Sequence, residues 1–255
     1  KLFQTAGNII ELIEKDDIPK YLLFLENVFP YMDNYNYQKG MKEIIQELKN
    51  FLKPKDIGTD SDRALLLDFQ ATLEIKPEKA IKLEKDALAQ IENITADNAR
   101  LVSNLHANLG GLYRMNGHPD LAREHMEKSI SLLDQFNLLH INDSIPQIAN
   151  YAMFLTEQQE PERGISELQK LSGIIKEYHS DDCLDYAKVQ ETLGTIYLMT
   201  ANLPQAKTHF KRAFKIYEKI WADEPEMIEA KYQEIQELYP QIGFCIGKNL
   251  SGLLT

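Results

Sequence analysis

Apolar residues recur along this chain at the three- and four-residue steps of an amphipathic helix, and the helical pattern itself repeats. The clearest copies are the segments Leu109-Gly110-x-x-Tyr113 and Leu193-Gly194-x-x-Tyr197. A degenerate copy that contains Tyr151 lies midway between them, and another that contains Leu67 lies one equal step before Leu109. The spacing predicts four helical units with a period of 42 residues.

A second helix is predicted in each unit, after a proline that suits a turn or a first helical turn. Near its start lies a small residue, at Ala80, Ala122, Gly164 and Ala206. Each unit is therefore a helix–turn–helix. The residues expected to cap the units are Thr95, Asp97, Asp143, Ser144, Ser180 and Asp181.

The flanks of the repeats are less regular, and we divide the chain into three segments of one continuous solenoid. Residues 1–57 contain a helix over 2–14 and an atypical repeat over 17–55. Residues 58–228 contain the four repeats, and residues 229–255 a C-terminal capping helix and a tail. The helix over 224–239 carries almost half of the net charge and is expected to be a solvated cap, with an electrostatic docking surface as the alternative. The apolar tail is expected to fold back on the last repeat, with a homodimer contact as the alternative.

The repeat resembles the tetratricopeptide repeat, whose signature is Leu-Gly-x-x-Tyr in the first helix and Ala-x-x-x-Phe-x-x-Ala in the second. Residues 193–213 carry every one of these residue types, and residues 109–129 carry them with two mild changes. The longer unit is similar to the 42-residue subclass of kinesin light chains and many bacterial signalling proteins. The resemblance implies an all-α fold, a right-handed superhelical α-solenoid of about five to six antiparallel helix pairs.

The resemblance also implies where a ligand binds, because the first helix of each pair lines a long concave surface in this family. Asn108 and Asn150 occupy one register position on it, and an amide offers a peptide backbone both a donor and an acceptor. A local hydrogen bond within the helix pair, or solvation alone, is the alternative role. Arg114 and Lys188 add positive charge for an acidic or carboxylate ligand. The predicted groove residues are Asn104, Asn108, Arg114, Asn150, Lys188 and Thr192.

One known activity of the family is not expected here. Relatives that bind chaperone tails use a five-residue carboxylate clamp, and only two of its five residue types are present at the corresponding positions. Those positions are Ala107, Gly111, Asn150, Lys188 and Thr192. Binding of heat-shock chaperone tails through such a clamp is therefore not predicted.

Composition narrows the function class further. The 255 residues carry a formal net charge of −11 and are 44% hydrophobic, which is typical of a folded chain and not of a disordered one. An acidic chain without a long apolar run does not predict binding to nucleic acid or to membranes. The two cysteines are too few for a disulfide framework, which favours a cytoplasmic location.

Catalytic chemistry is not predicted, because the six histidines are scattered and no metal-ligand or cofactor motif has the required spacing. We expect no cofactor, no metal and no enzyme. The predicted function is a scaffold or adaptor that binds a protein or peptide. The alternative is a ligand-sensing regulatory segment of a larger bacterial signalling protein, of the signal-dependent NTPase or peptide-pheromone receptor type. The first residue, Lys1 in place of Met, favours such a fragment.

Overall fold

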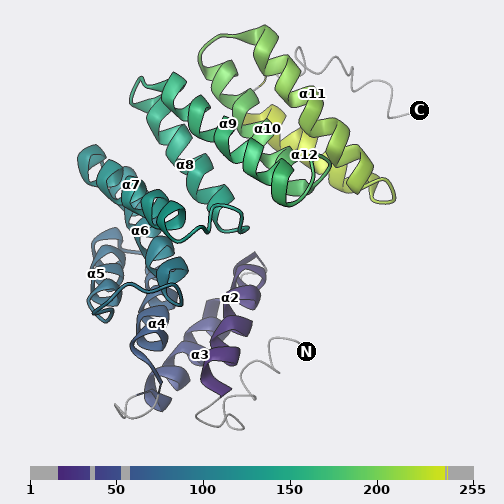
Figure 1. Cartoon of the computed structure of the whole chain (residues 1–255). Helices are drawn as coiled ribbons and strands as arrows, with labels where there is room; N and C mark the ends of the chain where they lie inside the picture. Colours follow the sequence, from purple (N-terminus) through teal and green to yellow (C-terminus); the bar gives the residue numbers. More distant parts are fainter. Residues whose placement is uncertain (1–16, 35–37, 53–57, 239, 241–255) are drawn as a thin grey trace. The chain divides into compact units, whose positions relative to one another are not determined.

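The computed structural model describes residues 17–34, 38–52, 58–238 and 240, and these residues form helices α2 to α12 without any strand (Figure 1). The predicted all-α class is confirmed. The helix predicted over 2–14 and the tail beyond 240 lie outside the described residues. The chain divides into two compact units, residues 1–136 and 137–255, and each is described by itself.

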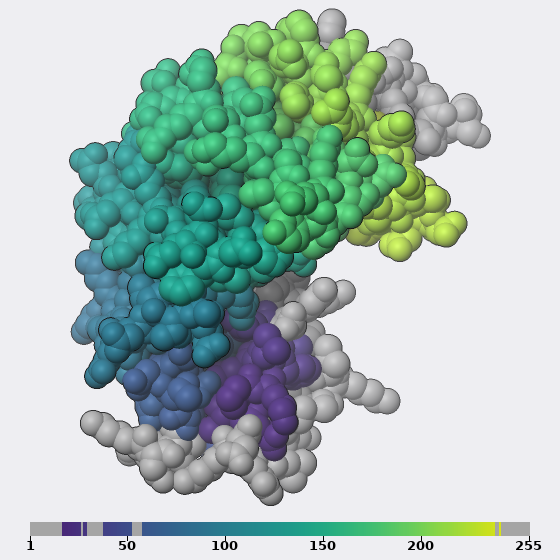
Figure 2. Space-filling model, viewed as in Figure 1, coloured from purple at the N-terminus to yellow at the C-terminus, as the bar shows by residue number. Residues whose placement is uncertain are grey.

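The described residues of unit 1 form three consecutive helix pairs. Their helices are α2 (Ile18–Asn34), α3 (Gln38–Phe51), α4 (Asp60–Thr72), α5 (Pro77–Leu88), α6 (Ala99–Met115) and α7 (Pro119–Gln135). One apolar core joins α2, α3 and α4 around Leu25, Met41 and Phe69. The surfaces of α2–α3, in purple, and α4–α5, in blue, adjoin in the space-filling view (Figure 2). The predicted atypical repeat over 17–55 is therefore a helix pair packed on the first 42-residue unit.

In unit 2, the residues that the structure describes form two helix pairs and one further helix. The helices are α8 (Ser144–Glu157), α9 (Pro161–Tyr178), α10 (Leu184–Met199), α11 (Leu203–Ile220) and α12 (Pro225–Leu238). The last of these is the helix predicted over 224–239. It packs on α11, where Tyr232 stacks on Phe214 with ring centroids 4.0 Å apart.

Small residues of the repeat lie where two helices meet closely. A Cβ added to Gly110 of α6 would lie 2.6 Å from the Met126 Cγ of α7, and one added to Gly194 would lie 3.0 Å from the Phe210 ring. The same holds at Gly164, where an added Cβ would lie 2.7 Å from the Ala152 carbonyl oxygen. The sequence pattern of small residues thus reflects close helix contacts.

The turns inside the three later pairs share one backbone feature. Gly117, Gln159 and Ala201, which occupy the same position in successive repeats, have φ of 72°, 65° and 58°. A left-handed residue just past a helix lets the chain reverse and satisfies the last carbonyl groups. Glycine adopts this conformation without strain, whereas the side chains of Gln159 and Ala201 resist it.

Several predicted caps are wrong. The residue before α6 is Asn98, so Thr95 and Asp97 lie in the preceding loop. The N-cap of α10 is Cys183, whose Sγ accepts a hydrogen bond from the Tyr186 N–H at 3.4 Å. Ser180 and Asp181, the predicted caps there, precede it.

The helix α8 starts where the sequence placed it, between Asp143 and Ser144. The Asp143 side chain makes no capping hydrogen bond, however. The Ser144 hydroxyl lies between the Leu139 and Ile141 carbonyl oxygens, at 2.7 and 2.8 Å. The serine therefore fixes the loop that precedes the helix.

Candidate functional site

The predicted groove residues lie on the first helices of the pairs, α6 in unit 1 and α8 and α10 in unit 2. One register position recurs immediately before a buried signature residue. Asn108 and Asn150 are exposed at this position, and Thr192 is half-buried. The repeat thus brings a polar side chain to the surface of each of these first helices at the same register position.

On α6, Asn108 already has a partner inside the protein. Its Nδ2 donates to Asp68 Oδ1 of α4 at 2.8 Å. Asn104 and Arg114 are half-buried, and each also interacts with other groups of the protein. This bond joins Asn108 to the first helix of the preceding pair, so it is not the hydrogen bond within the helix pair that we considered as the alternative role.

The partner of Asn108 belongs to a pair of acids that could not be inferred from the repeat. Asp68 on α4 lies against Glu84 on α5, and only 2% of Glu84 is exposed. Burial, together with the neighbouring Asp68 carboxyl, raises the pKa of Glu84 well above its ordinary value, and burial also raises the pKa of Asp68. Asp68 and Glu84 therefore share a proton at neutral pH. Asp68 has the lower pKa of the two acids, and its carboxyl accepts the hydrogen bond from Asn108.

On α8 and α10 the predicted residues are more available. Asn150 makes no hydrogen bond to any residue of the described chain and is exposed. Lys188 is exposed, with its Nζ 3.6 Å from Asp185 Oδ1, a loose ion pair in water. The Thr192 hydroxyl donates to the Lys188 carbonyl oxygen, one turn back, at 3.0 Å. Lys188 and Thr192 therefore lie one turn apart on the same face of α10.

Two further polar clusters escaped the sequence analysis. In the α6–α7 pair, His106 Nδ1 lies 2.8 Å from His125 Nδ1, and the His125 ring stacks on Tyr113. Burial is the main cause that lowers the pKa of His106 to about 4, and the nearby His125 adds to it. Gln190 and His209 occupy the corresponding positions of α10 and α11, and His209 Nδ1 lies 2.9 Å from Gln190 Oε1 in a hydrogen bond. The signal was present in the sequence, because both pairs have the same separation along the chain and occupy the same positions of their repeats.

The second missed cluster joins α12 to the preceding pair. Lys231 Nζ lies 3.0 Å from Glu191 Oε1 of α10, and Tyr217 donates its hydroxyl proton to Glu191 Oε2 at 2.6 Å. Lys231 also pairs with Glu234 at 3.2 Å. The basic residue of α12, Lys231, thus joins this helix to an acid of α10.

Other chemistry is limited in the described residues. They contain no group of three or more His, Cys, Asp or Glu side chains arranged to hold a metal ion. None of the helices that the structure describes is long and apolar enough to cross a membrane.

Comparison with known proteins finds a family model for part of the repeats. Residues 144–219, which span α8 to α11, match the family model described as Tetratricopeptide repeat. This segment consists of tetratricopeptide repeats. The family resemblance predicted from the signature residues is confirmed, and the tetratricopeptide repeat fold is generally a protein-interaction scaffold.

Solved structures with a similar fold include other tetratricopeptide-like proteins. A Podosopora anserina protein described as putative kinesin light chain nearly identical TPR-like repeats has 13% identity and a TM-score of 0.58, over 77% of this chain and 96% of that one. A point variant of that protein has 13% identity and a TM-score of 0.61, over 79% and 98%. BtubC (BKLC) from P. vanneervenii has 16% identity and a TM-score of 0.53, over 79% and 74%. These likenesses confirm the predicted fold of tetratricopeptide-type helix pairs.

No curated protein matches this chain in sequence. The comparisons give no support to the alternative of a sensor segment from a larger signalling protein.

Proposed function

We propose that this chain is a non-catalytic module that binds an extended peptide segment of a partner protein. The contact is made by the first helices of its tetratricopeptide-like pairs. The module acts as a scaffold or adaptor in the cytoplasm. The repeat supports this proposal because stacked helix pairs present large surfaces that are ordered before a ligand arrives, so the receptor loses little entropy on binding.

Asn150 carries the proposal. Its amide is exposed, has no partner among the described residues, and stands directly before the buried Tyr151. A peptide in extended conformation repeats one N–H and one C=O per residue, and a single amide can bind both. The neighbouring first helix of unit 2 adds Lys188 and Thr192, which suit a ligand that carries a carboxylate near the same stretch of backbone.

The α6 residues have a different role in the proposal. Asn108 must exchange its Asp68 hydrogen bond for one to the ligand, or use its amide oxygen while the bond to Asp68 persists. Asn104 and Arg114 extend the same helix surface. We therefore expect the α6 contribution to binding to be smaller than the contribution of Asn150, because Asn150 gives up no internal bond.

The test begins with a random peptide library displayed on phage and selected against the full chain. A selected peptide is then titrated into Asn150→Ala and into Gln169→Ala, an exposed amide on the second helix α9. Loss of one good hydrogen bond predicts a weakening of about tenfold for Asn150→Ala and no change for the control. Equal affinity of both variants would contradict the assignment of this surface.

Asn108→Ala is informative only with a stability measurement beside it. Removal of its amide also removes a donor from Asp68, so the thermal midpoint is expected to change together with the affinity. A variant that loses stability but keeps full peptide affinity would show that Asn108 has a structural role alone.

A further inference from the structure

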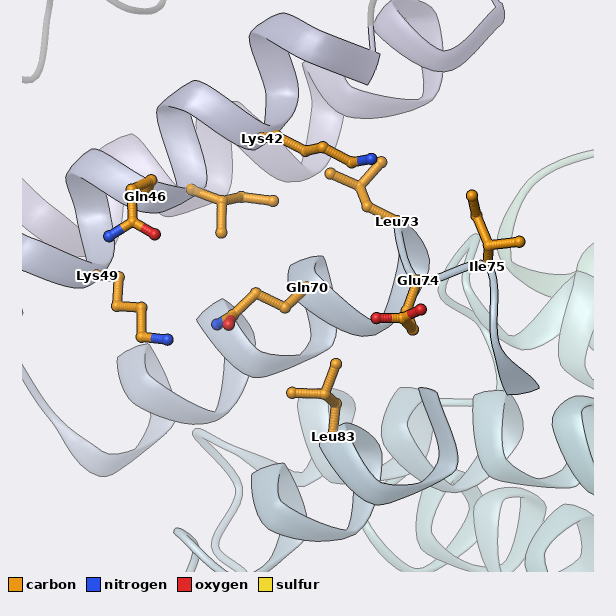
Figure 3. Close-up of a pocket in the computed structure, with 9 residues that line it drawn as sticks. Lys42, Gln46, Lys49, Gln70, Leu73, Glu74, Ile75 and Leu83 are labelled. Carbon is orange, nitrogen blue, oxygen red and sulfur yellow. The ribbon is translucent and has the colours of Figure 1, made fainter. Parts of the chain in front are cut away.

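A pocket of about 330 Å³ opens in unit 1 between α3, the end of α4 and α5. Its volume is at the lower end of the range of ligand sites. Figure 3 shows side chains that enter it from these three elements, with Leu83 of α5 opposite the side chains of α3. The lining residues are Lys42, Ile45, Gln46, Lys49, Gln70, Leu73, Glu74, Ile75 and Leu83. We refer to it as the α3–α5 pocket.

The apolar part of the pocket is aliphatic. Ile45 of α3, Leu73 at the C-cap of α4 and Leu83 of α5 form its walls, and the described lining residues include no aromatic ring. Ile75, in the turn between α4 and α5, is 87% exposed at the rim. Binding of an apolar group that covers this exposed isoleucine is favourable, because it removes apolar surface from water.

The charge of the pocket is opposite to that of the chain. Lys42 and Lys49 line it from α3, are exposed, and form no ion pair with any described residue. The acids of α3 lie elsewhere: Glu43 pairs with Lys39, and Glu47 faces Tyr21. In an acidic protein, two cations on one side of a helix without an ion pair to the described residues favour an anionic ligand.

One acid lines the pocket, and it has a structural partner. Glu74 Oε1 accepts a hydrogen bond from the Lys76 N–H at 3.1 Å, just before α5 begins. The Gln70 amide donates to the Leu66 carbonyl oxygen at 3.1 Å, which leaves its own oxygen for a ligand N–H. The Glu74 carboxylate keeps its charge, so the two lysines and this one acid leave the listed lining with a net positive charge.

The spacing of the lysines defines the ligand. Two turns of helix separate them by about 10 Å along α3. In an extended peptide, side chains at alternate positions share one face, and four residues span about 13 Å. A flexible lysine side chain accommodates the difference. Acids at the first and fifth positions would reach Lys42 and Lys49 while the third side chain enters the aliphatic walls.

We propose that the α3–α5 pocket binds an extended acidic peptide in which one aliphatic side chain lies between two carboxylates, all three at alternate positions. None of the lining residues of this pocket is among the predicted groove residues on the first helices α6, α8 and α10. It is made by the second helices α3 and α5 and the end of α4. Its existence does not depend on the function proposed above.

The experiment uses the full chain and a fluorescein-labelled peptide, Gly-Glu-Ser-Leu-Ser-Glu-Gly with blocked ends, in a fluorescence anisotropy titration. An isomer with Leu moved next to the first Glu keeps the charge and composition but turns the Leu to the opposite face. We expect saturable binding of the first peptide and at least about fivefold weaker binding of the isomer.

Matched variants locate the site. The double variant Lys42→Glu/Lys49→Glu is expected to weaken the first peptide by at least about tenfold. Lys79→Glu/Lys82→Glu changes the same charge on exposed α5 positions outside the pocket and is expected to weaken it by less than about threefold. Ile75→Ser tests the apolar contact without a change of charge, with an expected loss of about threefold.

Three results would overturn the proposal. They are no binding at about 1 mM peptide, equal binding of the two isomers, and equal weakening by the two double charge reversals. Thermal midpoints of all variants within about 2 °C of the parent chain show that the fold is retained; all altered positions are exposed, so this is the expected result.

Discussion

The α6–α7 pair of unit 1 and the α10–α11 pair of unit 2 are built on one plan but filled differently. Both have a glycine against a large side chain and a tyrosine ring stacked on a histidine, Tyr113 on His125 and Tyr197 on His209. The stacked rings are 5.4 and 5.3 Å apart between centroids. The repeat therefore reproduces the shape of the contact between two helices.

The interior groups of these two pairs differ in polarity. Ser103 and Ser129 meet at 3.2 Å between hydroxyl oxygens inside α6–α7, whereas Ala187 and Ala213 occupy those positions in α10–α11. At the histidine pair, His106 is replaced by Gln190. The 42-residue repeat thus specifies the sizes of the packed side chains and the placement of the rings, but not the hydrogen-bonding groups inside each pair. We therefore expect the two pairs to differ in stability and in their response to pH.

The largest expected effect is the loss of the ring that packs on the signature glycine. Phe210 is fully buried against Gly194, and Phe210→Ala is expected to lower the free energy of unfolding by about 3–5 kcal/mol, because it leaves a cavity. Met126→Leu, at the corresponding position of α7, conserves volume and is expected to cost less than about 1.5 kcal/mol. Urea unfolding followed by circular dichroism measures both, and a loss for Phe210→Ala no larger than that for Met126→Leu would contradict the packing role of Phe210.

The histidine pair gives α6–α7 a pH response. The pKa of His106 is about 4 in the folded chain, below its ordinary value of 6.5, so His106 binds a proton less readily when folded than when unfolded. Stability is therefore present above pH 6.5 and is lost as the pH falls toward 4. Buried His106 faces His125 and Lys128, both of which oppose its protonation. We expect a loss of roughly 2 kcal/mol between pH 7 and pH 5.

His106→Gln converts this pair into the arrangement of Gln190 and His209 and is the control. Its unfolding free energy should fall less between pH 7 and pH 5 than that of the parent chain, because one depressed histidine has been removed. A smaller pH response should remain in this variant, because burial also lowers the pKa of His125. An unchanged pH slope would show that the His106–His125 contact does not control the response.

Buried acids give a response of the opposite sign. The pKa of Glu84 lies above its ordinary value of 4.5 because of burial and the nearby Asp68, so stability falls as the pH rises above 4.5. Glu84→Gln offers Asp68 an amide donor and is expected to raise stability by about 1 kcal/mol at pH 8. Glu191→Gln should lower it, because Glu191 pairs with Lys231. Thermal unfolding at pH 6 and 8 distinguishes them; stabilisation by both substitutions would contradict the account.

The smallest expected effects are at the left-handed turns. Ala201→Gly should stabilise the chain by about 0.5–1 kcal/mol, since φ at Ala201 is 58°, and Gly117→Ala should destabilise it by about the same amount, since φ there is 72°. Differential thermal unfolding measures both. The same sign of change for the two substitutions would show that backbone conformation is not the cause.

The sequence predicted the fold well because periodicity averages over many residues. Helix pairs, turns and small residues were found from the 42-residue spacing, and the final helix from its own apolar pattern. Capping was predicted less well, since it depends on which side chain meets the first free N–H groups. The N-cap of α10 is Cys183, three residues after the predicted Ser180.

The candidate sites were partly outside the reach of sequence reasoning. The register of Asn108 and Asn150 followed from the repeat, but the contact between Asn108 and Asp68 joins residues 40 positions apart and needs the packed helices. The α3–α5 pocket escaped because its cations belong to the atypical pair, where the repeat pattern is weakest. The histidine pair could have been found, since the same separation recurs two repeats later between Gln190 and His209.

The central claim is that a peptide ligand is held by the first helices of the pairs. Hydrogen exchange measured on the full chain, with and without a selected peptide, tests it directly. The account predicts slower exchange in α8 and α10, with a smaller change in α6, and little change in α7, α9 and α11. Slower exchange confined to those second helices would contradict it.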